Sequence, residues 1–210
     1  MRHTTLVAIS VGILALVPAV APADIMTYNG MGLKDTVKVH APGHLADNLT
    51  VHAGQLHVTY LGEDYDAFCV DIDQYVGTSE VDEWTVYDLP QNGDLIAFLF
   101  ETYADGVATG VEAAALQVAI WEVLSETDDS FFDLTSGNFQ ILNNAPVVAL
   151  ATTYLATVPG SYTPIIEPVV LHSETKQDVI ISGGQVPEPA SLSVLSLGAV
   201  LSLIRRRRRR

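Results

Sequence analysis

Two residues stand out because their side chains could react and their surroundings need an explanation. Cys69 is the only cysteine among the 210 residues, so no disulfide can form within the chain. A thiol without a disulfide partner serves either as a small buried hydrophobe or as a nucleophile. Gln117 has apolar residues three and four positions away on both sides, which predicts a buried carboxamide. A buried amide without partners costs about 1–3 kcal/mol, so this one must be hydrogen-bonded or consumed by a reaction.

The residues around Cys69 alternate as they do in a β-strand. Phe68, Val70 and Ile72 would share one face of such a strand, while Cys69 and Asp71 would share the other. We expect the apolar set to face the main core and Cys69 to lie on a different surface. This pattern favours a functional thiol, although a cysteine that only fills the core remains the alternative.

The elements that must position Cys69 and Gln117 are strands followed by helices. Short alternating or β-branched runs separated by Gly and Pro predict an antiparallel sheet, and Ala- and Leu-rich stretches predict helices. Asn92 and Thr109 are expected helix caps, and Pro146 suits the first turn of a third helix. The predicted fold class is α+β, an antiparallel β-sheet or sandwich with a packed insertion of two to three helices. The expected strands are 36–39, 55–61, 67–72, 83–87, 163–170 and 178–181, and the expected helices are 94–103, 111–125 and 144–156.

Both ends of the chain carry patterns typical of membrane handling. Residues 1–23 have a basic Arg2, an apolar run and an Ala21-Pro22-Ala23 end, which predicts a secretory signal peptide cleaved after Ala23. At the other end, Pro187-Glu188-Pro189 precedes an apolar run over 192–204 and six arginines from Arg205 onwards. That run is shorter than the ~20 residues a comfortable transmembrane helix needs. The arginines are expected to stay on the cytoplasmic side.

The C-terminal pattern over 187–210 resembles the PEP-CTERM sorting signal. The resemblance implies processing by an exosortase-type enzyme in a Gram-negative bacterium that makes exopolysaccharide. It also implies anchoring in the inner membrane by the C-terminal helix during sorting, then release to the cell surface or extracellular matrix. An ordinary C-terminal membrane anchor is the alternative, and both place the domain outside the inner membrane. We therefore expect one globular domain over 24–182 and a linker over 183–186.

The residues around Cys69 and Gln117 resemble the thioester domains of bacterial surface adhesins. The resemblance rests on Phe68-Cys69-Val70-Asp71 and on Leu116-Gln117-Val118-Ala119-Ile120-Trp121, and it covers roughly residues 60–155. Residues 132–139 (FDLTSGNF) extend it to the variant found on PEP-CTERM proteins. It implies that Cys69 attacks the Gln117 carboxamide, that ammonia leaves, and that Phe68 and Trp121 shield the resulting thioester. An incoming amine or hydroxyl would then take the acyl group. The adhesins often have threonine where this chain has Leu116.

Composition limits the partners. Seven of the ten basic residues lie in the two terminal segments, so the rest of the chain has only three lysines against 24 acidic residues. This negative charge argues against nucleic acid and anionic membrane surfaces as partners. Cations, basic surfaces and calcium-bridged polysaccharide are more compatible.

Metal binding is the weaker interpretation of two side-chain groups. Calcium could bind the clustered aspartates, but no loop has the spacing of an EF-hand, and a solvated acidic surface is the default. The histidines lack a zinc-binding frame, so we expect polar surface residues, no metal and no cofactor. The aspartates are Asp64, Asp66, Asp71, Asp73, Asp128, Asp129 and Asp133, and the histidines are His40, His44, His52 and His57.

Two functions remain open, and neither is that of a turnover enzyme. The first is a reactive surface protein that attaches once to an amine or hydroxyl through Cys69 and Gln117. The second is a non-reactive structural protein of the exopolysaccharide matrix that acts through acidic surface contacts.

Overall fold

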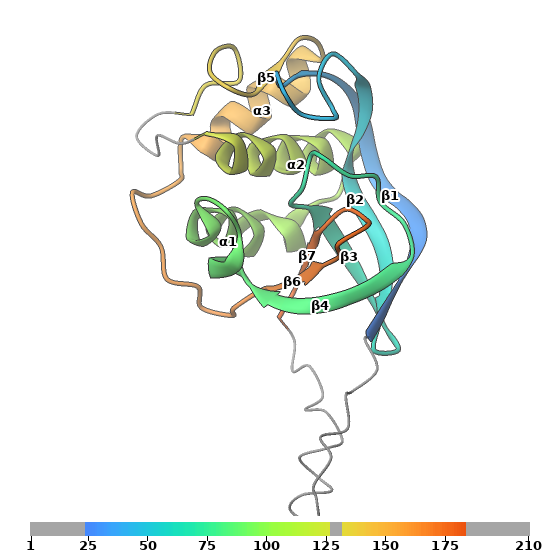
Figure 1. The fold of residues 1–210 in the computed structure, drawn as a ribbon. Coiled ribbons are helices and arrows are strands. Elements are labelled where there is room, and N and C mark those ends of the chain that lie inside the picture. The colour runs from blue at the N-terminus through green and yellow to red at the C-terminus, as the bar shows by residue number, and fades with distance from the viewer. Residues whose placement is uncertain (1–23, 127–131, 184–210) are drawn as a thin grey trace, which may run out of the picture.

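The computed structural model describes residues 24–126 and 132–183, which form one α+β unit with three helices packed against curved antiparallel strands (Figure 1). This confirms the predicted fold class. The strands are β1 (Asp24–His40), β2 (Thr50–Tyr60), β3 (Glu63–Cys69), β4 (Ser79–Thr85), β5 (Gln140–Ile141), β6 (Val169–His172) and β7 (Val179–Ile181).

The strand pairings close into a ring. Along the sheet the order is β2-β3-β7-β6-β4-β1-β5, and β1 also pairs with β2, so six strands complete a circuit and β5 is an appendage on β1. All of these pairings are antiparallel. The long β1 can pair with both β4 and β2 because it bends at irregularities between Tyr28 and Gly30 and between Met31 and Lys34.

The helices are α1 (Gly93–Tyr103), α2 (Gly110–Ser125) and α3 (Ala145–Leu155). Their bounds agree with the sequence prediction to within about a residue. Thr109 caps α2 by accepting a hydrogen bond from the Glu112 N–H, and Pro146 lies in the first turn of α3. Asn92 precedes α1 but makes no side-chain cap; its amide instead donates to the Val123 and Glu126 carbonyls.

Helix α2 is the central element of the core. Residues 113–124 of α2 are all buried. Figure 1 shows α2 between α3 and α1, with the curved strands β1 and β2 beside it. A helix that is buried all round needs no polar face, which explains why α2 is apolar along its length.

Most of the predicted strand bounds need correction. Strand β2 begins at Thr50 and not at 55, β3 covers Glu63–Cys69 and not 67–72, and β4 covers Ser79–Thr85 and not 83–87. The segment 163–168 is not a strand, because β6 begins only at Val169; its Ile165 and Ile166 N–H groups donate to the Glu101 carboxylate instead of to a neighbouring strand. Strand β1 begins much earlier than residue 36, and the short β5 was not expected.

The predictions for the two ends of the chain lie outside the described residues. These are the signal peptide over 1–23, the Pro187-Glu188-Pro189 motif, the apolar run and the arginines from Arg205. No helix within 24–126 and 132–183 is long and apolar enough to cross a membrane.

Candidate functional site: Cys69 and Gln117

Cys69 ends strand β3 at a point where the sheet changes partners. Strands β2 and β3 pair as far as Leu56 and Ala67, and β3 then continues against β7, where Cys69 lies opposite Val179. The next main-chain N–H, that of Val70, donates toward β7 at the Asp178 carbonyl. The main-chain groups of Cys69 face the other way, toward the side that β2 has left.

The Gln117 side chain fills the place of the missing strand. Its Oε1 accepts the Cys69 N–H at 2.8 Å, and its Nε2 donates to the Cys69 carbonyl at 2.8 Å. Exchanging the amide oxygen and nitrogen would place donor against donor and acceptor against acceptor, so this pairing fixes the amide orientation. Gln117 is 1% exposed, which confirms that the carboxamide is buried. The sequence prediction that these two residues meet therefore agrees with the structure.

The Cys69 sulfur lies at the N–H edge of the Trp121 indole. The Trp121 Nε1–H donates to Sγ at 3.3 Å, and the Asp71 N–H donates to the same sulfur at 3.3 Å. The thiol itself donates to the Asp71 main-chain carbonyl. Burial raises the pKa of the Cys69 thiol well above its usual range, while the hydrogen bonds from Trp121 and Asp71 act in the opposite direction. The thiol is therefore protonated at neutral pH.

Cys69 does not lie on a separate surface as the strand alternation predicted. It is 2% exposed, and Phe68 and Val70 on the other face are buried as well. Helix α2 covers the Cys69 face, and α1 covers the Phe68 face through an edge-to-face contact between Phe68 and Phe100 with ring centroids 6.2 Å apart. Both sides of β3 are buried because each faces a helix.

The two predicted shielding residues therefore have different positions. Trp121, 6% exposed, contacts the sulfur directly. Phe68 is fully buried but packs toward Phe100, on the opposite face of β3 from the sulfur. Leu116, at the position where the adhesins often have threonine, is also fully buried, and the Gln117 amide is held by main-chain groups alone.

The arrangement brings together a thiol, an acyl group and a donor to the acyl oxygen, which are three of the groups that acyl transfer uses. A nucleophile, Cys69 Sγ, belongs to the residue against which the Gln117 carboxamide is held. The Cys69 N–H already points at Oε1, where negative charge would develop if the carbonyl carbon were attacked. Cys69 and Gln117 are 2% and 1% exposed, so the pair is shielded from bulk water.

A carboxylate that the sequence analysis did not single out lies one residue beyond Trp121. Glu122 is fully buried; its Oε1 accepts the Asp133 N–H at 2.7 Å, and its Oε2 has no hydrogen-bond partner among the described residues. Burial raises the pKa of Glu122 to about 8. The same argument that singled out Gln117 applies to this polar residue within an apolar helix.

Within the described part of the chain, the acidic and histidine side chains do not assemble into a metal centre. No group of three or more potential ligands occurs among residues 24–126 and 132–183, and Asp128 and Asp129 lie outside them. The Asp133 carboxylate accepts hydrogen bonds from the Thr135 N–H and the Ser136 hydroxyl. Four aspartates each pair with one histidine; the pairs are His40–Asp47, His44–Asp73, His57–Asp66 and His172–Asp178, the last of which was not expected. Asp64 accepts a hydrogen bond from the Thr59 hydroxyl, and Asp71 accepts one from the Asp73 N–H. The His52 side chain is exposed.

Comparison with protein-family models, with curated proteins and with solved structures gave no match.

Proposed function

We propose that this chain is an exported protein of the cell surface or extracellular matrix that attaches covalently to its target through an internal thioester between Cys69 and Gln117. The observation that carries the proposal is the paired hydrogen bonding, at 2.8 Å in both directions, between the Gln117 carboxamide and the main chain of Cys69. This pairing holds the acyl group against the residue that carries the thiol. The terminal segments of the sequence support export and sorting by an exosortase-type enzyme.

The chemistry consists of two acyl transfers. In the first, Sγ of Cys69 bonds to Cδ of Gln117, the Cδ–Nε2 bond breaks, and the thiol proton leaves with the amide nitrogen as ammonia. In the second, an amine or hydroxyl of the target attacks Cδ, the C–S bond breaks, and a proton from the attacking group restores the thiol. The protein is then joined to its target through Gln117, once per molecule, so it is not a turnover enzyme.

A non-reactive structural protein of the exopolysaccharide matrix is the second candidate, and two observations favour it. Both polar atoms of the Gln117 amide already have main-chain partners, so the core glutamine is satisfied without any reaction. Burial also keeps the Cys69 thiol protonated, which makes it a poor nucleophile. In this case the exposed acidic residues would make the functional contacts.

The mass of one peptide distinguishes the two candidates. Lys38 and Lys176 flank both site residues and no lysine lies between them, so lysine-specific cleavage yields a single peptide, 39–176, whatever happens at the chain ends. Thioester formation lowers its mass by about 17 Da, and methylamine treatment of the folded protein then raises it by about 31 Da. The Cys69→Ala peptide should show the unmodified mass before and after methylamine.

Full mass in the untreated wild-type peptide, with one free thiol and no gain from methylamine, would refute the thioester and leave the structural protein. The digestion should be carried out at mildly acidic pH without reducing agent, so that a thioester is not hydrolysed before it is measured.

A further inference from the structure

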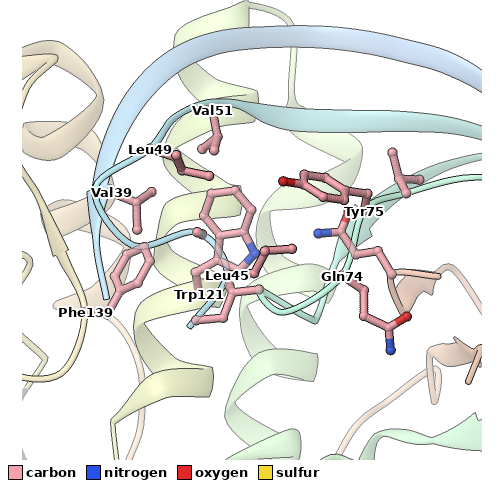
Figure 2. Close-up of a pocket in the computed structure, with 12 residues that line it drawn as sticks. Val39, Leu45, Leu49, Val51, Gln74, Tyr75, Trp121 and Phe139 are labelled. Atoms are coloured by element: carbon pink, nitrogen blue, oxygen red, sulfur yellow. The ribbon is translucent and has the colours of Figure 1, made fainter. Parts of the chain in front are cut away.

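An apolar pocket of about 140 Å³ lies at the end of β1 and β2, directly beside the Cys69 site. Figure 2 shows the Trp121 indole inside a ring formed by Val39, Leu49, Val51, Tyr75 and Phe139. None of the residues that line the pocket carries a charge, in a chain with 25 acidic residues. An uncharged hollow of this kind is typical of a site for an apolar group.

Two lining residues connect the pocket to the reactive pair. Trp121 donates to the Cys69 sulfur at 3.3 Å, and Gln177 donates at 2.8 Å to the Asp71 carbonyl that also accepts the Cys69 thiol. Cys69 and Gln117 do not themselves line the pocket. The Trp121 indole therefore separates the pocket from the Cys69 sulfur.

The rim of the pocket exposes apolar surface that the fold does not use. Leu45, Leu49 and Tyr75 are 44%, 40% and 68% exposed, and all three border the pocket. Clustered exposed apolar side chains around a hollow mark a binding surface.

We propose that this pocket binds the apolar part of the acyl acceptor, and that the acceptor is a primary amine bearing a group the size of phenyl or isobutyl. The inference rests on the proposed thioester. An engineered apolar cavity of about 150 Å³ in another protein binds benzene, so the volume suits a single ring. With Trp121 turned aside, the amine nitrogen attacks Cδ of Gln117, the C–S bond breaks, and one amine proton passes to Cys69 Sγ.

Binding is tested first in the full chain carrying Cys69→Ala, which cannot form a thioester. The probe is benzyl alcohol, a neutral analogue of benzylamine, and methanol is the control without a ring. The readout is the NMR signal of the Trp121 indole N–H, which is assigned with Trp84→Phe. We expect this resonance to shift saturably with benzyl alcohol and not with methanol. Adding Leu49→Asp should abolish the shift, whereas Leu142→Asp, at a leucine 50% exposed and outside the pocket, should not. Absence of a saturable shift overturns the pocket, whether or not a thioester forms.

Reaction is tested in the wild-type chain by following thiol release. At equal concentrations of neutral amine, benzylamine should release the Cys69 thiol about tenfold faster than methylamine or more, since burying the ring contributes favourably. Leu49→Asp should remove the difference, and Leu142→Asp should keep it. Equal rates for the two amines overturn the acceptor assignment while leaving the thioester in place. No thiol release by either amine, with binding intact, refutes the proposed function and the acceptor assignment together.

Discussion

Replacing Gln117 by leucine should destabilise the domain more than the same replacement at any glutamine with fewer main-chain bonds. The change is best made in the Cys69→Ala background, because there the Gln117 side chain is an amide in every molecule. Leucine is close in size but leaves the N–H and C=O of residue 69 without partners in the core. Each unpaired buried group costs about 1–3 kcal/mol, which gives about 2–6 kcal/mol for the pair.

Gln55→Leu is the matched control. Gln55 is also buried, at 5% exposure, but its Oε1 accepts a single hydrogen bond from the described residues, the Leu33 N–H at 3.3 Å, and Leu33 is 39% exposed. Both variants gain the same apolar side chain, so the gain cancels in the difference between them. We expect Gln117→Leu to lose at least about 1–3 kcal/mol more of its free energy of unfolding than Gln55→Leu.

Urea unfolding followed by circular dichroism measures that difference. With a slope of about 1–3 kcal/mol per molar urea, the midpoints of the two variants should differ by about 1 M. Equal midpoints, or a larger loss for Gln55→Leu, would refute the view that Gln117 substitutes for a strand beside Cys69.

Two further predictions concern the neighbours of the site. Trp121→Phe should speed alkylation of the Cys69 thiol in folded protein whose thioester has been opened with methylamine, because the smaller phenyl ring separates the pocket from the sulfur less completely. Trp84→Phe should leave the alkylation rate unchanged. Equal alkylation rates for wild type and Trp121→Phe would contradict the position given to Trp121. Burial raises the pKa of Glu122 to about 8 from an unfolded value of 4.5. Between about pH 4.5 and pH 8 the unfolded chain therefore releases a proton that the folded state retains. The domain loses stability as pH rises through this window. In urea unfolding at pH 5 and pH 8, the free energy of unfolding of the wild type should fall by up to about 1.4 kcal/mol per pH unit relative to that of Glu122→Gln. If the free energies of unfolding of the two proteins change with pH in parallel, the burial of an ionisable group at this position is contradicted.

The helices were predicted well because their signals are local. Thr109, Pro146 and the absence of Gly and Pro within the apolar stretches define them without reference to the rest of the fold. The closed ring of strands was not predictable in the same way, since it depends on β1 bending to pair with both β2 and β4. Nothing in the residues 163–168 alone indicates that Glu101, far away in the chain, takes up their main-chain donors.

The site was predicted in part. The apolar neighbours of Gln117 correctly indicated burial, and the resemblance paired it with Cys69. The main-chain hydrogen bonds between them could not be inferred, because they exist only where β2 separates from β3. The surface placement of Cys69 was wrong because alternation identifies two faces of a strand but not whether helices cover both.

The ring of strands also fixes which way the domain points. Strand β1 begins at Asp24 beside β4, and β7 ends at Ile181 heading toward the β2–β3 hairpin, so both ends of the domain emerge on one side (Figure 1). Val39, which lines the pocket, lies at the other end of β1, roughly 50 Å away along its curved path at about 3.3 Å per residue. A protein tethered through its C-terminal segment would thus carry the pocket at the end of the domain far from the tether, where a neighbouring cell or polymer could reach it.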